Sequence, residues 1–254
     1  MAVGLKIYFA SDLHLGTPDY EISLRRERLF VQWLDMAAED AGEIFLVGDI
    51  FDFWHDYKTV VPKGYVRLLG KLAELSDRGI KLHIFTGNHD LWFDDYFEKE
   101  LGACVYRHPV ERTFDGKLFF IGHGDGLGPK DLGYKFIKKI FTNPVCRWLF
   151  RWIHPDMGIR LASWLSYRSR YSNGSHELEK YLGEDNEWLL QYCKRLLERK
   201  KYNYFVFGHR HLPLDVLIDV NSRYVNLGDW LDYNSYAVWD GEKLELKYYN
   251  ESLK

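Results

Sequence analysis

Five short apolar runs, each ending in Gly or Ser and then in acidic, amide or imidazole residues, constrain the fold of this chain most. Each run has the length and composition of a buried strand. Helices are expected over residues 21–41 and 64–78, because their apolar residues recur at helical spacing. Strands that alternate with helices predict a layered α/β fold whose site lies in loops at the carboxyl ends of strands. The runs are LKIYFASDLH, EIFLVGDIFDFW, KLHIFTGNHD, KLFFIGHGD and YNYFVFGHRH.

The polar residues at these run ends have one consistent chemistry. A single acid at a strand end is usually a turn or helix cap, but five similar ends indicate a common site. Carboxylates, imidazoles and an amide without a thiolate are typical ligands of Mn²⁺, Fe²⁺ or Mg²⁺, more than of structural zinc. The candidates are Asp12, His14, Asp49, Asp52, Asn88, His89, Asp90, His123, Asp125, His209 and His211.

So many candidate ligands favour two metal ions over one. A carboxylate can bridge two ions about 3.5–4 Å apart, and such a pair can activate water and hold a phosphoryl group. The sequence therefore predicts metal-dependent phosphoryl chemistry.

Composition and charge exclude several other classes of protein. With 46% hydrophobic residues and a formal charge of −3, the chain is globular and has no overall attraction to nucleic acid. Three widely spaced cysteines without a CxxC pair favour a reducing cytoplasm. The N-terminal apolar stretch is too short for a signal peptide, and no run reaches the roughly 18 apolar residues of a membrane span. We therefore expect a cytoplasmic protein, or one at the membrane surface.

The order of these residues resembles the calcineurin-like metallophosphoesterase family. The family pattern D-x-H, G-D-x-x-D, G-N-H-[DE], G-H and G-H-x-H is present in full between residues 12 and 211. The resemblance implies a four-layered α/β sandwich around two central sheets. It also implies a single metallophosphoesterase domain over residues 1–254, with a helical cap insertion at about 130–185.

The family resemblance implies a role for each matching residue. His89, Asp49 and Asp90 would act in catalysis, with His89 as proton donor or phosphate contact and Asp90 as the group that orients it. Two divalent metal ions, expected to be Mn²⁺, would share Asp49 as a bridge. The two implied ligand sets are Asp12, His14, Asp49 and His211, and Asp49, Asn88, His123 and His209.

Within this family the chain most resembles the UDP-2,3-diacylglucosamine pyrophosphohydrolases of the lipid A pathway. The stretches GDIFDFW, HGDGLGPKDLGY and NLGDW carry this resemblance. The chain departs from this group at His89, where the best-known members have Arg. Arg and His do not bind phosphate in the same way, so the identity of the substrate stays open. The implied substrate contacts are Asn88, His89, Asp131, Ser169, Asn173, His176 and His209.

The segment between the fourth and fifth blocks carries a local basic and aromatic patch. Residues 134–171 contain eight Lys or Arg, one acid and nine aromatic residues, and Pro144, Pro155 and Gly158 are expected to break them into short helices. Their apolar faces could pack together as a cap or lie on an anionic membrane. Nucleic acid is a third possibility, less consistent with the resemblance. The candidate apolar residues are Phe136, Ile140, Trp148, Leu149, Trp152, Leu161, Trp164 and Leu165.

Three functions follow from the sequence. The first is a hydrolase, peripheral on the cytoplasmic face of the inner membrane, that splits UDP-2,3-diacylglucosamine into UMP and a lipid sugar phosphate. The second is the same machinery acting on a soluble nucleotide or another phosphodiester or phosphomonoester. The third is a scaffold with a vestigial metal site, which the intact ligand set disfavours.

Overall fold

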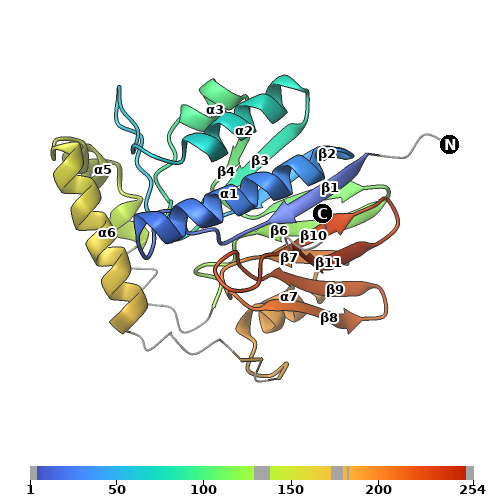
Figure 1. Ribbon diagram of the computed structural model, residues 1–254. Helices are drawn as coiled ribbons and strands as arrows, with labels where there is room; N and C mark the ends of the chain where they lie inside the picture. The colour runs from blue at the N-terminus through green and yellow to red at the C-terminus, as the bar shows by residue number, and fades with distance from the viewer. Residues whose placement is uncertain (1–4, 129–137, 173–179, 182, 250–254) are drawn as a thin grey trace.

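The computed structural model describes residues 5–128, 138–172, 180–181 and 183–249 of the 254-residue chain. Its elements form four layers, with three helices over one sheet, a second sheet beneath it, and one helix on the far side (Figure 1). This arrangement confirms the predicted four-layered α/β sandwich. The covering helices are α1 (Tyr20–Ala37), α2 (Val66–Asp77), α3 (Tyr96–Leu101) and, on the far side, α7 (Trp188–Leu197).

The strands of the first sheet lie in the order β11-β10-β1-β2-β3-β4, and those of the second in the order β5-β6-β7-β9-β8. Parallel pairing joins β1, β2, β3 and β4 in one sheet and β6, β7 and β9 in the other. Because parallel strands end at the same edge of a sheet, their following loops gather there. The strand bounds are β1 Lys6–Ala10, β2 Ala41–Val47, β3 Lys81–Phe85, β4 Cys104–Tyr106, β5 Val110–Phe114, β6 Lys117–Gly122, β7 Tyr204–Phe207, β8 Pro213–Asp219, β9 Ser222–Leu227, β10 Ser235–Trp239 and β11 Leu244–Tyr248.

Three apolar clusters fill the spaces between the four layers. In β1, Tyr8 and Ala10 pack toward the helices, while Ile7 and Phe9 pack toward the second sheet. A third cluster joins the second sheet to α7 through buried residues such as Leu189. Side chains that alternate between two apolar faces explain why the strands read as continuous hydrophobic runs. Each fully buried large side chain contributes roughly 1.5–3 kcal/mol.

The two helices predicted over residues 21–41 and 64–78 are confirmed as α1 and α2. The carboxylate of Asp19 caps α1 by accepting the N–H of Ile22 at 2.9 Å. The helix ends at Ala37, earlier than expected, because the chain turns and begins β2 at Ala41. The late part of the chain is rich in strands, which form β7 to β11.

Two further helices, α5 (Pro144–Arg151) and α6 (Pro155–Ser172), lie together at one end of the sandwich, drawn in yellow at the left of Figure 1. Each begins at a proline, which tolerates the first helical position because its missing N–H is not needed there. Gly158, which was expected to break the segment, lies inside α6. A glycine is needed at this position because a Cβ would collide with Tyr57 and crowd Phe150. Among the described residues, no helix is long and apolar enough to span a bilayer.

Candidate metal centre

Residues from five strand-end loops meet at one edge of the sandwich. The loops after β1, β2, β3, β6 and β7 supply side chains that form three overlapping groups, and within each group the potential ligand atoms lie within 4.8 Å of one another. The three overlapping groups are Asp12, His14 and His211; His14, Asp49 and His89; and Asp49, His123 and His209.

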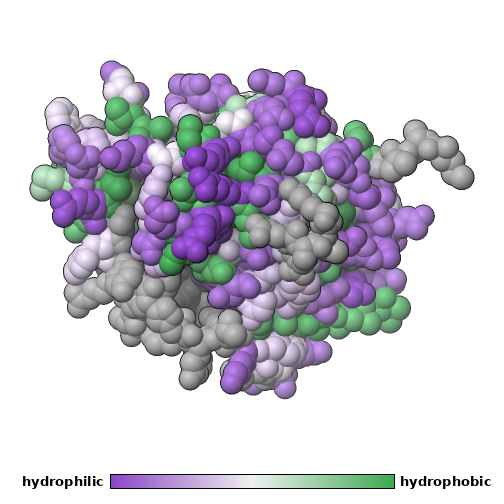
Figure 2. Space-filling view, viewed as in Figure 1, coloured by the Kyte–Doolittle hydropathy of each residue, from purple (hydrophilic) through white to green (hydrophobic). Residues whose placement is uncertain are grey.

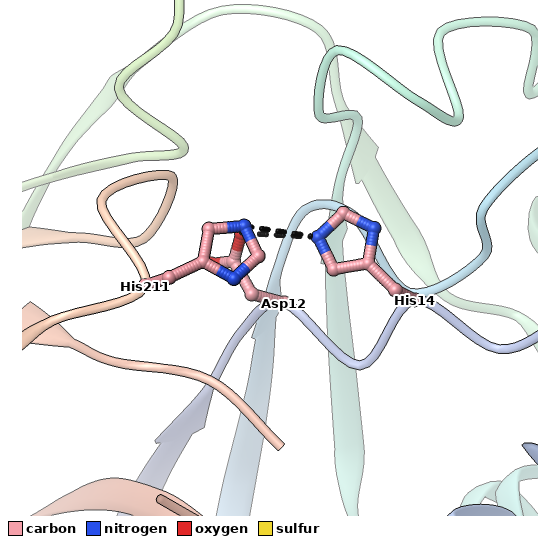
Figure 3. A group of neighbouring side chains, drawn as sticks. All are labelled: Asp12, His14 and His211. Atoms are coloured by element: carbon pink, nitrogen blue, oxygen red, sulfur yellow. Dashed lines mark hydrogen bonds and ion pairs between the residues drawn. The ribbon is translucent and has the colours of Figure 1, made fainter. Parts of the chain in front are cut away.

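In the first group, two imidazoles and a carboxylate converge (Figure 3). The Nε2 atoms of His14 and His211 lie 3.2 Å apart. The Oδ1 atom of Asp12 lies 3.6 Å from the first and 3.4 Å from the second. In the described part of the chain, this buried Oδ1 has no hydrogen-bond partner. Such an unpaired oxygen beside two ring nitrogens fits a cation site.

The carboxylate of Asp49 lies between His14 of the first group and His123 of the third. Its Oδ2 atom is 3.7 Å from Nε2 of His14 and 3.3 Å from Nε2 of His123. The side-chain Oδ1 of Asn88 is 3.2 Å from the same His123 nitrogen. His209 shares a group with Asp49 and His123. Asp49 is therefore placed as a ligand shared by two ions would be.

Strained backbone accompanies several candidate ligands. Residues other than glycine rarely adopt the left-handed region, and such strain persists where the surroundings hold it, often at functional sites. The N–H of His209 donates to Asp12 Oδ2 at 2.9 Å, and the N–H of His89 donates to Asp49 Oδ1 at 2.8 Å. These bonds hold the loops in place. The strained candidates are Asp12 (φ 57°), His14 (φ 45°), Asp49 (φ 51°), His209 (φ 68°) and His211 (φ 51°).

Two glycines permit the loops to approach so closely. A Cβ on Gly87 would overlap the carboxylate of Asp49, and one on Gly208 would overlap Ser11 and the carboxylate of Asp12. Sterics therefore explain why a glycine precedes Asn88 and why another precedes His209.

The charge balance of the cluster calls for a cation. Burial raises the pKa of Asp12, but neighbouring histidines, His211 foremost, lower it to about 2. Burial lowers the pKa of His123, but Asp49 and Asp12 raise it to about 10. The carboxylates thus hold a proton on a buried imidazole, and a divalent cation would supply that positive charge instead. The donor set and the unpaired Asp12 oxygen both fit such an ion.

Asp90 was expected to orient His89, but its carboxylate has a different set of partners. It is fully buried and joins the loop after β2 to the loop after β3. The oxygens beside the His89 ring belong to Ser166 and Asp52. Burial, and then Asp49, raise the pKa of Asp90 to about 7. Its hydrogen-bond donors are the backbone N–H groups of Gly87 (2.7 Å), Ile50 (2.8 Å), Asp49 (3.3 Å) and Phe51 (3.3 Å).

The His89 ring lies where the cluster meets the cap helices. Its Nδ1 atom is 2.8 Å from Oγ of Ser166 and 3.6 Å from Oδ1 of Asp52. The ring stands edge-on to His14, with centroids 4.8 Å apart. The side chain of His89 is 17% exposed, so it is only partly buried.

Asp229 supports the cluster and was missed from the sequence. Its Oδ2 lies 3.0 Å from Nδ1 of His211, while its Oδ1 accepts the N–H groups of Asp232 and Tyr233. A carboxylate in this place fixes the ring orientation and tautomer of a ligating histidine. The signal was available, because Asp229 follows β9 in the run YVNLGD, like the other five strand ends.

Arg26 is a second supporting residue that the sequence did not reveal. Its guanidinium, buried under α1, donates to the backbone oxygens of Leu13, His14 and Thr17 at 2.9–3.1 Å. It thereby holds the loop after β1. The pattern of α1 does not separate this arginine from its exposed neighbours Arg25 and Arg28.

The predicted substrate contacts in the insertion are not placed by the described structure. Asp131, Asn173 and His176 lie outside the described residues, and Ser169 belongs to α6 without a described side chain. Phe136 also lies outside. Asp125, a candidate at the fourth strand end, pairs with Lys138 at 2.5 Å and so links the loop after β6 to the insertion.

Comparison with known proteins gives a consistent result. The model of the calcineurin-like phosphoesterase family matches residues 5–213. A UDP-2,3-diacylglucosamine hydrolase from Porphyromonas gingivalis is 40% identical over 253 residues, covering 95% of this chain and 97% of that protein. The protein of the same name from Ectopseudomonas mendocina is 28% identical, covering 93% and 95%. That from Pseudomonas putida is 27% identical, covering 91% and 93%.

Proposed function

The chain belongs to the calcineurin-like phosphoesterase family, and from this premise we propose that it hydrolyses UDP-2,3-diacylglucosamine to UMP and 2,3-diacylglucosamine 1-phosphate in lipid A biosynthesis. Membership makes it a metal-dependent phosphoester hydrolase. The observation that carries the substrate proposal is 40% identity, over nearly the whole length, to a protein named for this activity. We treat residues 1–254 as one domain with a cap insertion at about 130–185.

The proposed metal centre uses two ligand sets. Family membership implies divalent ions, and Mn²⁺ is the proposed ion because it accepts carboxylate, amide and imidazole ligands together. When bound, two such ions activate water and neutralise phosphoryl oxygens. One proposed set is Asp12, His14, Asp49 and His211, and the other is Asp49, Asn88, His123 and His209, consistent with their grouping in space.

The remaining residues would position the substrate and handle protons. His89, whose side chain is partly exposed, would donate a hydrogen bond or a proton from Nε2 to the pyrophosphate. Asn88 and His209 would also touch the substrate. Asp229 would keep His211 in its ligating orientation, and Asp90 would hold the two loops in register. The leaving group is itself a phosphate, so it needs little assistance from a proton donor.

The cap helices support a lipid-linked substrate and peripheral attachment to the inner membrane. On α5 the exposed apolar residues recur at helical spacing as Val145 (61% exposed), Trp148 (57%), Leu149 (55%) and, just past the helix, Trp152 (76%). On α6 a second exposed stripe contains Met157 (67%), Leu161 (46%), Trp164 (52%) and Leu165 (43%). Hydrophobic and hydrophilic surface alternate at this end of the molecule (Figure 2). An interfacial amphipathic helix has this composition.

Polar contacts tie α5 to the core on its other side. Arg147 and Arg151 both pair with the carboxylate of Asp94, and Phe150 packs against Trp92 with ring centroids 4.6 Å apart. The apolar stripe of α5 is therefore left for another partner. In a segment with eight Lys or Arg and one acid, an anionic lipid surface matches both the charge and the apolar area.

The direct experiment follows UMP release from UDP-2,3-diacylglucosamine in mixed micelles by mass spectrometry, with Mn²⁺ present. Bis(p-nitrophenyl) phosphate serves as a soluble control substrate. Release of UMP with Mn²⁺ and not with EDTA is expected. Protein that cleaves the control but not the lipid would overturn the substrate and favour a soluble phosphodiester. No turnover of either substrate with any divalent ion would overturn the hydrolase.

A further inference from the structure

A hydroxyl of the cap contacts the side chain of His89, one of the candidate metal-centre residues. Oγ of Ser166, on α6, lies 2.8 Å from Nδ1 of His89, a residue 77 positions earlier in the chain. The family pattern concerns strand-end loops, and it assigns nothing to Ser166. This contact is a direct polar connection from α6 to the loop that carries Asn88 and His89.

Two different oxygens compete for Nδ1 of His89. The carboxylate of Asp52, at 3.6 Å, can only accept a hydrogen bond and would therefore favour a proton on Nδ1. The hydroxyl of Ser166, at 2.8 Å, can donate or accept, so it can hold a bare Nδ1 with the proton on Nε2 by donating to it. Its distance is that of a hydrogen bond, whereas 3.6 Å to the carboxylate is too long for one.

We propose that Ser166 is a positioning residue that donates to Nδ1 of His89 and holds its Nε2–H ready for the substrate phosphate. The cap then belongs to the phosphate site, and His89 is correctly oriented only when α6 lies in place. This inference rests on the proposed function for its substrate, but not for its geometry.

Contacts elsewhere on the cap set where α6 lies. Gly158, near the start of α6, packs so closely that a Cβ would overlap Tyr57 and crowd Phe150. Ser166 is eight residues further on, roughly 12 Å along the helix. The helix is thus seated at one end and contacts His89 near the other. A substrate whose acyl chains rest on the cap should therefore depend on Ser166 more than a small diester that never touches it.

Kinetics of two Ser166 variants test this coupling. With the lipid-linked substrate, Ser166→Ala should lower kcat about five- to tenfold, as loss of one hydrogen bond predicts, with KM changed less than about twofold. The loss should be smaller with bis(p-nitrophenyl) phosphate, and Ser166→Thr should restore most of kcat. Thr142→Ala is the matched control, because in the described part of the chain its hydroxyl donates within the insertion, to the backbone oxygen of Lys138 at 2.8 Å.

Three kinetic results would overturn the proposal. They are wild-type kcat in Ser166→Ala, an equal loss with both substrates, or a change confined to KM.

A second measurement does not depend on the substrate. Nitrogen-15 spectra of histidine-labelled, Mg²⁺-loaded protein report which ring nitrogen of His89 carries the proton. We expect Nε2–H in the wild type and in Ser166→Thr, and a shift toward Nδ1–H in Ser166→Ala, where Asp52 remains. An unchanged tautomer in Ser166→Ala would overturn the positioning role, even if the protein releases UMP. Absence of UMP release with the expected tautomers would overturn only the proposed substrate.

Discussion

The strand-end cluster and the cap depart from ordinary burial in opposite directions. In the cluster, charged and polar side chains are withdrawn from water, with Asp12 at 0% exposure and Asp49 at 1%. On the cap, tryptophans face outward, with Trp148 at 57% and Trp152 at 76%. A buried charge is unfavourable unless an opposite charge or a metal ion pairs with it, and an exposed apolar stripe is unfavourable unless a partner covers it. Each departure is consistent with the ligand that we propose for it, cations in the strand-end cluster and lipid at the cap.

The two regions also differ in how firmly the chain holds them. In the cluster, Asp90 joins the loop after β2 to the loop after β3, and Arg26 holds the loop after β1. In the cap, α5 is held to the core by the ion pair between Arg147 and Asp94, and α6 contacts His89 through Ser166. We therefore propose that the chemistry takes place in the strand-end cluster and that the cap captures the substrate.

The largest expected effect comes from removing the shared ligand. Asp49→Asn should lower kcat by about 10³-fold or more, because both metal sites lose a ligand. In wild-type protein, Mn²⁺ at 100 times its dissociation constant should add about 2.7 kcal/mol to the free energy of unfolding. Thermal denaturation with Mn²⁺ or EDTA measures this, and the variant should gain much less. Asp35→Asn, at an exposed acid on α1, is the control and should behave as wild type.

The next effect concerns the support behind His211. Asp229→Ala should weaken metal binding about 10- to 100-fold, because the imidazole loses the carboxylate 3.0 Å from its Nδ1. Calorimetric titration with Mn²⁺ measures the affinity directly. Wild-type affinity in this variant would show that the ring needs no such support.

A smaller effect should appear where the cap rests on the core. His55 is buried among Tyr57, Trp92 and Phe150 with both ring nitrogens unpaired in the described structure. Burial foremost lowers its pKa to about 4; Asp94 opposes this shift, while Arg151 and Arg147 add to it.

The pH dependence follows from the sign of that shift. The unfolded chain binds a proton at His55 below about pH 6.5, while the folded protein resists until about pH 4, so stability falls as the pH drops between these values. His55→Phe should remove about 2 kcal/mol of this loss at pH 5. Urea denaturation at pH 7 and pH 5 measures it. The exposed His154→Phe should leave the acid loss intact, and an unchanged loss in His55→Phe would refute the assignment.

The smallest expected effect concerns the lipid surface. Replacing Trp148 and Trp152 together with Ser should weaken binding to anionic vesicles about tenfold while leaving kcat for bis(p-nitrophenyl) phosphate unchanged. Vesicle co-sedimentation measures the partition. Leu217→Ser, at an exposed leucine on β8, is the control for loss of apolar surface elsewhere. Equal binding by all variants would remove the membrane from the account.

The sequence predicts the layered fold and the gathering of the strand-end residues because both follow from local pattern. Strand length, helical period and the glycines before Asp49, Asn88 and His209 are all visible along the chain. The roles of those residues in catalysis stay predictions. The fold class is confirmed, because alternating side chains of β1 and β2 do bury two faces.

Other features could not be predicted because they depend on tertiary contacts. Ser166 and His89 are 77 residues apart, and no spacing rule connects them. Arg26 looks like a surface residue of α1 until the loop after β1 folds over it. Asp90 follows His89 directly, which suggested a partnership, but its carboxylate points to backbone N–H groups instead. Sequence neighbours in a tight loop need not be partners.

Anomalous diffraction from crystals grown with Mn²⁺ tests the central claim, that the buried cluster is built for two cations. Two peaks about 3.5–4 Å apart are expected. The Asp49 carboxylate should lie between them, with His14 and His211 on one side and His123 and His209 on the other. A single peak, or no peak among these residues at saturating Mn²⁺, would contradict it.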